Sequence, residues 1–192
     1  MKKIYSVLTL AVMLAIFLCF PVSAAQTHGV IYDETESLGS QSLTFQGEET
    51  LPVLSEMLGV DMRVDVLTEI SGDSLEDVAA GIYEEYDYGY GDAKEGVTLT
   101  ILLIPQGGDS YAMPADNGWC VYANMREERG GSQGLSDAVR EAVEPYMVER
   151  AWNGEDMTMS ATALSQAVEV MAEAATDYIS ANYMPDDSGG DI

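Results

Sequence analysis

The chain has 192 residues and carries 33 acidic side chains against eight lysines and arginines, a formal net charge of −25 at pH 7. Such a surface repels the phosphates of nucleic acids and the headgroups of anionic lipids, so we expect neither nucleic-acid binding nor polybasic docking to lipid. Divalent cations and cationic partners are favoured instead, although most of these carboxylates can equally serve solubility.

The first 25 residues have the three parts of a secretory signal. Lys2 and Lys3 provide the positive start, residues 4–20 are mostly apolar, and small residues lead up to a cleavage site near Ala24 or Ala25. We therefore predict an exported protein, extracellular or in the cell envelope. The alternative is an uncleaved N-terminal membrane anchor, because an apolar run of about 17 residues is near the minimum that spans a bilayer.

The rest of the chain has the length of one ordinary domain, which we place at residues 26–183. The acidic tail, 184–192, is predicted to be disordered. Cys120 is the one cysteine outside the predicted signal. No intramolecular disulfide can then form, so the fold depends on its apolar core.

Helical and extended patterns alternate along this domain. Apolar residues three and four apart predict helices, whereas strict alternation or a continuous apolar run predicts strands. After a short apolar start at 30–32, the pattern gives strands near 60–66, 97–104, 111–113 and 119–122, and helices near 48–58, 74–88, 135–144 and 160–181, with a turn or kinked continuation at 146–152. Strands separated by helices predict an α/β fold, a three-layer α/β/α sandwich with a central sheet of about four strands.

The segment YGYGDAKEG, residues 88–96, lies between the helix at 74–88 and the buried strand at 97–104. A phosphate-binding glycine loop instead lies between a strand and the helix that follows, where free N–H groups meet the anion. Here the loop follows a helix, so carbonyl groups and the negative end of the helix dipole gather beside it. Phosphate recognition by this loop is therefore disfavoured.

Carboxylates near this loop suit a hard cation such as calcium, which binds carboxylate and carbonyl oxygens. Asp87, Asp92 and Glu95 are the candidate ligands, although their spacing does not follow an EF-hand. The alternative is that they face water. Tyr88 and Tyr90 fall outside the apolar stripe of the helix and are candidate partner-binding residues, because aromatic side chains are enriched at interfaces. They could equally cover the sheet edge locally.

Four pieces of the sequence, in order, resemble the TPM-domain family of exported bacterial, thylakoid-lumen and receptor-accessory proteins. They are VIYDETESL from residue 30, SGDSLEDVA from residue 71, the YGYGDAKEG segment and VTLTILLI from residue 97. The resemblance covers most of residues 29–182 and implies an α/β/α sandwich outside the membrane. It places Asp33, Asp92 and Glu95 at or beside acidic positions of the family, which adds Asp33 to the candidate metal ligands. Lys94 and Glu95 depart from the aspartate-asparagine pair usual in the family.

Some members of this family are described as acid phosphatases, so the resemblance implies an alternative function, a metal-assisted acid phosphatase using Asp33, Asp92 and Glu95. The residues support it little. His28 is the only histidine and lies close to the predicted cleavage site, and the acidic surface repels an anionic substrate. We therefore favour an exported, non-catalytic accessory domain that binds an envelope or membrane protein, with calcium as its candidate cofactor.

Overall fold

The computed structural model describes residues 30–35, 43–71, 74–108, 110–114, 116–147, 150–152 and 157–182. The predicted signal, 1–25, and the predicted tail, 184–192, lie outside the described residues. In chain order the elements are β1 (Ile31–Asp33), α2 (Leu43–Leu58), β2 (Asp61–Leu67), α3 (Leu75–Glu85), β3 (Gly96–Leu102), β4 (Ile104–Gly107), β5 (Ser110–Met113), β6 (Trp119–Asn124), η1 (Glu127–Arg129), α4 (Gly131–Val143), η2 (Glu144–Tyr146), β7 (Arg150–Trp152) and α5 (Met157–Asn182).

The central sheet has four strands in the order β1-β2-β3-β6. The first three run parallel, and β6 pairs antiparallel with β3. The predicted strand at 97–104 is divided, since β3 ends at Leu102 and β4 begins at Ile104 as part of a small second sheet, β4-β5-β7. A central sheet of about four strands is confirmed.

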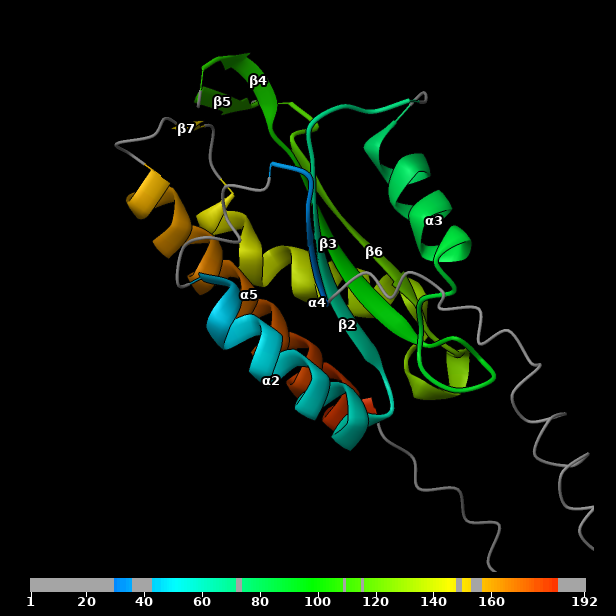
Figure 1. Cartoon of the computed structure of the whole chain (residues 1–192). Helices are drawn as coiled ribbons and strands as arrows, with labels where there is room; N and C mark the ends of the chain where they lie inside the picture. Colours follow the sequence, from blue (N-terminus) through cyan, green and yellow to red (C-terminus); the bar gives the residue numbers. More distant parts are fainter. Residues whose placement is uncertain are drawn as a thin grey trace, which may run out of the picture.

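Helices cover both faces of the central sheet (Figure 1). α2, α4 and α5 lie on one face and α3 lies on the other. The alternation of β2 sorts its side chains between them, because successive residues of a strand point to opposite faces. Met62, Val64 and Val66 join the large core, whereas Leu67 packs with Leu75 of α3. The predicted three-layer sandwich is confirmed.

Helix α3 begins where the sequence predicts and ends earlier. The Ser74 hydroxyl caps it by accepting the Asp77 N–H at 3.1 Å. The helix was predicted to continue to residue 88, but it ends at Glu85. Asp87 and Gly89 have φ angles of 54° and 101°, a left-handed conformation that an α-helix cannot contain.

Helix α2 starts at Leu43, five residues before the predicted start. Pro52, expected in the first turn, therefore lies inside the helix, where it lacks the N–H for one backbone hydrogen bond. Within the described ranges, no helix combines the length and apolar character that crossing a bilayer requires.

Candidate binding pocket beside the glycine turn

The segment after α3 forms a closed turn directly before β3. The Tyr90 N–H donates to the Glu95 carbonyl at 2.8 Å, and the Glu95 N–H donates back to the Tyr90 carbonyl at 3.1 Å. Gly89 lies so close to the other arm that an added Cβ would be 2.5 Å from the Lys94 carbonyl. The turn therefore depends on glycine at this position.

Hydrogen bonds from three neighbouring elements fix the position of this turn. The Gly89 N–H donates to a carboxylate oxygen of Asp61 in β2 at 3.0 Å. The Lys94 carbonyl accepts hydrogen bonds from the Tyr83 hydroxyl of α3 at 2.9 Å and from the Asn124 amide of β6 at 2.7 Å. Contacts from three elements make the turn a rigid part of the fold.

Glu95 is buried at the start of β3, with 3% of its side chain exposed, and two arginines bind it. Arg126 donates to Glu95 from its side chain at 2.9 Å and from its backbone N–H at 3.1 Å. Arg129 donates to the other carboxylate oxygen at 2.6 Å and also to the carbonyl groups of Leu58 and Gly59. Burial alone would raise the pKa of Glu95, but the hydrogen bonds from the two arginines outweigh it and lower this pKa.

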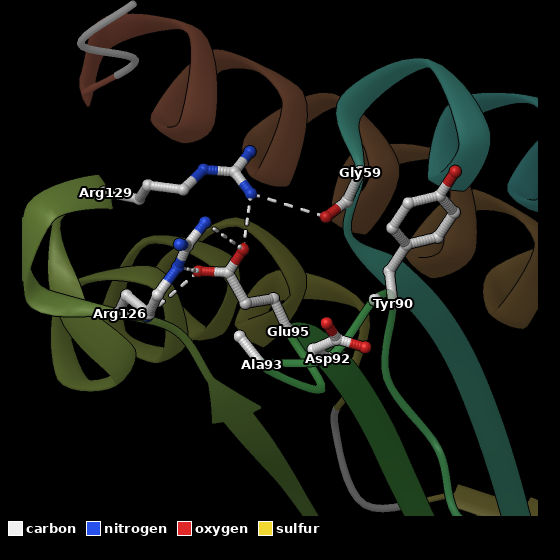
Figure 2. Close-up of a pocket in the computed structure, with 8 residues that line it drawn as sticks. Gly59, Tyr90, Asp92, Ala93, Glu95, Arg126 and Arg129 are labelled. Atoms are coloured by element: carbon white, nitrogen blue, oxygen red, sulfur yellow. Dashed lines mark hydrogen bonds and ion pairs between the residues drawn. The ribbon is translucent and has the colours of Figure 1, made fainter. Parts of the chain in front are cut away.

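A pocket of about 360 Å³ opens above this ion-paired group. Figure 2 shows the guanidinium groups of Arg126 and Arg129 on one side of it and the Tyr90 ring on the other, with Asp92 below the tyrosine. Tyr90 is 44% exposed, and the side chain of Arg126 is 59% exposed. The full lining is Gly59, Tyr90, Gly91, Asp92, Ala93, Glu95, Arg126 and Arg129.

The four predicted calcium ligands do not form one site. Asp33, the last residue of β1, pairs with Val66 near the C-terminal end of β2. Glu95 directly precedes Gly96, and Gly96 pairs with Asp61 at the N-terminal end of β2. Asp61 and Val66 are five residue steps apart along β2, so the two predicted ligands lie roughly 17 Å apart in the direction of the strand.

The partners of the predicted ligands also differ from those expected. Asp87 pairs with Lys94 at 2.8 Å, and Asp33 accepts the N–H and hydroxyl of Thr35. Asp92 and Glu95 both line the pocket, and Glu95 is already neutralised by its two arginines. In the part of the chain that the structure describes, no three acidic, histidine or cysteine side chains are grouped as a metal site requires. These residues do not fit a calcium ion together.

The two candidate tyrosines have different environments. Tyr90 lies at the surface and lines the pocket, so its prediction as a partner-binding residue stays a prediction. The prediction that Tyr88 is available at the surface is wrong, because the side chain is 3% exposed and its ring lies 4.0 Å from the Arg63 guanidinium. The left-handed residues Asp87 and Gly89 on either side of it reverse the chain and turn Tyr88 back toward the sheet.

Sequence reasoning missed Arg126 and Arg129, which lie 31 and 34 residues after Glu95. Both arginines lie between the strand predicted near 119–122 and the helix predicted near 135–144, where no local pattern marks a function. One signal could have found them: Glu95 directly precedes a buried strand in a chain with few basic residues, and a buried carboxylate requires a cationic partner.

Comparison with known proteins identifies a shared fold. No family model matches the chain, and no curated protein matches it. The chain is similar to the N-terminal domain of a protein from P. gingivalis, solved by NMR, with a TM-score of 0.53 and 15% identity over 85% of this chain and 92% of that one. The BA42 protein of Bizionia argentinensis, a psychrophilic bacterium, aligns with a TM-score of 0.42 and 14% identity over 72% of this chain and 84% of its own. At this identity the first likeness shows the fold alone.

Proposed function

We propose that this chain is an exported, non-catalytic accessory domain that binds a partner protein of the cell envelope through the pocket beside the 89–95 turn. The observation that carries the proposal is the pocket of about 360 Å³, which is lined on one side by an exposed tyrosine, Tyr90, and on the other by the exposed side chain of Arg126. Tyrosine and arginine are the residues that most often carry binding energy at protein interfaces.

The rigidity of this pocket supports the same function. Tyr90 stands on a turn closed by two backbone hydrogen bonds, and Arg126 is held to the buried carboxylate of Glu95. Binding surfaces that are already ordered avoid the entropic cost of fixing side chains and loops on association. Both residues can therefore contribute to affinity without rearrangement of the backbone.

The geometry favours binding over the alternative, a metal-assisted acid phosphatase. Asp33 lies at the other end of the sheet from Asp92 and Glu95, so the three cannot share a cation. Both oxygens of Glu95 already accept hydrogen bonds from arginines, and its lowered pKa makes it a weak general base. Calcium coordination by these carboxylates is disfavoured for the same reasons.

The proposal agrees with the TPM-like resemblance of the sequence. The four-stranded α/β fold, shared with the P. gingivalis domain, is compatible with a TPM-like domain. Export and an envelope location follow from the predicted signal at residues 1–25. The partner is accordingly a protein that is reached outside the cytoplasm.

A photo-crosslinking side chain placed at Tyr90 in the full chain tests this proposal in the organism of origin. Val53 is the matched control, since it is 64% exposed and lies on α2. We expect one discrete crosslinked protein from position 90 that is absent from position 53. The same products from both positions, or none from position 90, would contradict partner binding through this pocket.

A phosphatase assay tests the alternative directly. We expect no hydrolysis of p-nitrophenyl phosphate above background by the purified protein, with either calcium or magnesium present. Hydrolysis that depends on one of these metals and is lost in Asp92→Asn would overturn the non-catalytic proposal and restore the enzymatic one.

A further inference from the structure

The face of the sheet that α3 covers carries an unusual group of buried polar side chains. β2 places Asp65 on this face and β3 places Thr98 and Thr100 there, all at most 1% exposed. Asp65 and Thr100 are direct partners in the parallel pairing of the two strands, so their side chains are neighbours. Tyr88, buried three residues beyond the last residue of α3, faces Asp65; burial is the main influence on the pKa of Asp65 and raises it, and the Tyr88 hydroxyl acts in the opposite direction.

The described residues satisfy these groups incompletely. Both carboxylate oxygens of Asp65 and the hydroxyl oxygens of Thr98, Thr100 and Tyr88 are buried without a partner in good hydrogen-bonding geometry. The Tyr88 hydroxyl nevertheless lies near enough to Asp65, and the Thr100 hydroxyl near enough to Cys120, to oppose the rise that burial causes in the pKa of each of these two groups. Native proteins pair nearly all buried polar atoms, with protein groups or with a bound water or ion. Five buried oxygens with incomplete hydrogen bonding on one small face therefore indicate a bound species that the polypeptide itself does not supply.

The charges on this face leave Asp65 without a full counter-charge. Arg63, two residues away on β2, pairs with Asp61 at 2.7 Å and lies over the Tyr88 ring. Its charge lowers the pKa of Asp65, but Asp61 and Glu34 act in the opposite direction. Burial is the largest influence and raises the pKa of Asp65 to about 7. An ionised Asp65 thus needs one additional positive charge.

We propose that the layer between the central sheet and α3 binds one monovalent alkali cation, sodium or potassium, through the Asp65 carboxylate and the hydroxyls of Thr98, Thr100 and Tyr88. The donor set is made entirely of oxygen, which hard cations prefer. A single carboxylate matches a single positive charge, whereas calcium sites in proteins usually gather several carboxylates. A cation here satisfies the unpartnered oxygens and neutralises Asp65 at once.

Thermal unfolding of the purified protein tests this site. The midpoint is measured at about pH 8.5, where a carboxyl group with a pKa of about 7 is ionised. Sodium chloride or potassium chloride replaces choline chloride at constant ionic strength, so that the salt screens the surface charges of the protein equally in all three solutions. We expect the midpoint to rise by several degrees with one alkali cation, because a ligand bound only by the folded form stabilises it.

Three variants locate the effect. Asp65→Asn keeps the size of the side chain and removes the charge, and it should abolish the rise. Thr100→Val keeps the shape and removes one oxygen, and it should weaken the rise. Asp137→Asn, the same change at an exposed position on α4, should leave it intact. Where sodium is the stabilising cation, sodium-23 NMR relaxation gives a second readout, with greater broadening in the parent protein than in Asp65→Asn, which keeps the same surface carboxylates.

Two outcomes would overturn the proposal. Equal midpoints in choline and in both alkali chlorides would show that a proton alone neutralises Asp65. If sodium or potassium still raised the unfolding midpoint of Asp65→Asn, the cation would bind at another place on this acidic protein.

Discussion

Glu95 is the residue on which the architecture of the pocket depends. It joins the start of β3 to Arg126 and Arg129, and Arg129 in turn binds the carbonyl groups of Leu58 and Gly59 at the end of α2. One buried carboxylate thereby connects the glycine turn, the η1 segment and the α2–β2 connection. Its role is structural, since its oxygens face arginines.

Replacing this carboxylate should destabilise the whole domain. Glu95→Gln leaves Arg129, whose side chain is mostly buried, without its counter-charge, and breaking a buried ion pair from one side costs about 3 kcal/mol. Urea unfolding measures the loss. The control is Glu128→Gln, an exposed position in the same segment, for which we expect a change within about 0.5 kcal/mol. Equal stabilities of the two variants would refute this role of Glu95.

Asp65 should make stability depend on pH. Its pKa is raised from 3.8 to about 7, mainly by burial, so the folded form holds the proton more tightly than the unfolded form does. The resulting stabilisation is complete below about pH 4, falls as the pH rises to about 7, and is constant above that. The total loss is about 4 kcal/mol.

Comparison with Asp65→Asn isolates this effect from the other carboxylates. Glu95, with its lowered pKa, acts in the opposite direction and loses its contribution as the pH falls. Denaturant unfolding in choline chloride, at a series of pH values, should therefore show a difference between parent and variant that changes between about pH 4 and 7. A difference independent of pH would show that Asp65 titrates normally.

At the scale of elements, the end of α3 is the decisive feature. The helix must stop at Glu85 for the chain to reverse and form the turn that carries Tyr90. Gly89 permits the reversal, with its positive φ and its close approach to the Lys94 carbonyl.

Gly89→Ala should therefore destabilise the protein by about 1–3 kcal/mol, because the added Cβ meets backbone atoms in a strained conformation. Gly81→Ala is the matched control, since Gly81 lies on the exposed side of α3 with open space around its Cα. That change should stabilise the protein by about 0.5–1 kcal/mol through helix propensity. Urea midpoints measure both, and a neutral or stabilising Gly89→Ala would contradict the described turn.

The sequence predicts these elements well where local patterns determine them. The Ser74 cap, the apolar stripe of α3 and the alternation of β2 are each set by residues close together in the chain. The early end of α3 was missed because Tyr86 continues the apolar stripe beyond the last helical residue. The pairing of Glu95 with Arg126 and Arg129 was missed because it joins residues more than 30 positions apart, which no local period reveals.

At the scale of the molecule, the layers are predictable but their connections are not. The steps from β1 to β2 and from β2 to β3 move in the same direction across the sheet, yet α2 and α3 lie on opposite faces. The two crossovers therefore have opposite hands, although nearly all such connections are right-handed. The periodicity of apolar residues predicts which residues of a helix are buried, but it does not predict which face of the central sheet that helix covers.

The distribution of charge makes the pocket different from the rest of this acidic protein. Lys94, Arg126 and Arg129 are three of the six basic residues outside the predicted signal, and all three lie at the turn or its pocket. Asp87, Asp92 and Glu95, together with the exposed Glu127 and Glu128 between the two arginines, place five carboxylates beside these three cations, a smaller acidic excess than the 33 acidic against eight basic residues of the whole chain. A partner that the acidic surface would otherwise repel can approach here.

The most direct test of partner binding is the affinity of the crosslinked protein for the purified chain and for Tyr90→Ala. We predict at least a tenfold loss of affinity in Tyr90→Ala, since removing a central aromatic anchor typically costs about 2 kcal/mol. Met57→Ala, an exposed apolar position on α2, should bind as the parent does. An unchanged affinity in Tyr90→Ala, with unfolding midpoints alike, would show that the partner binds elsewhere and would contradict the proposed function of this pocket.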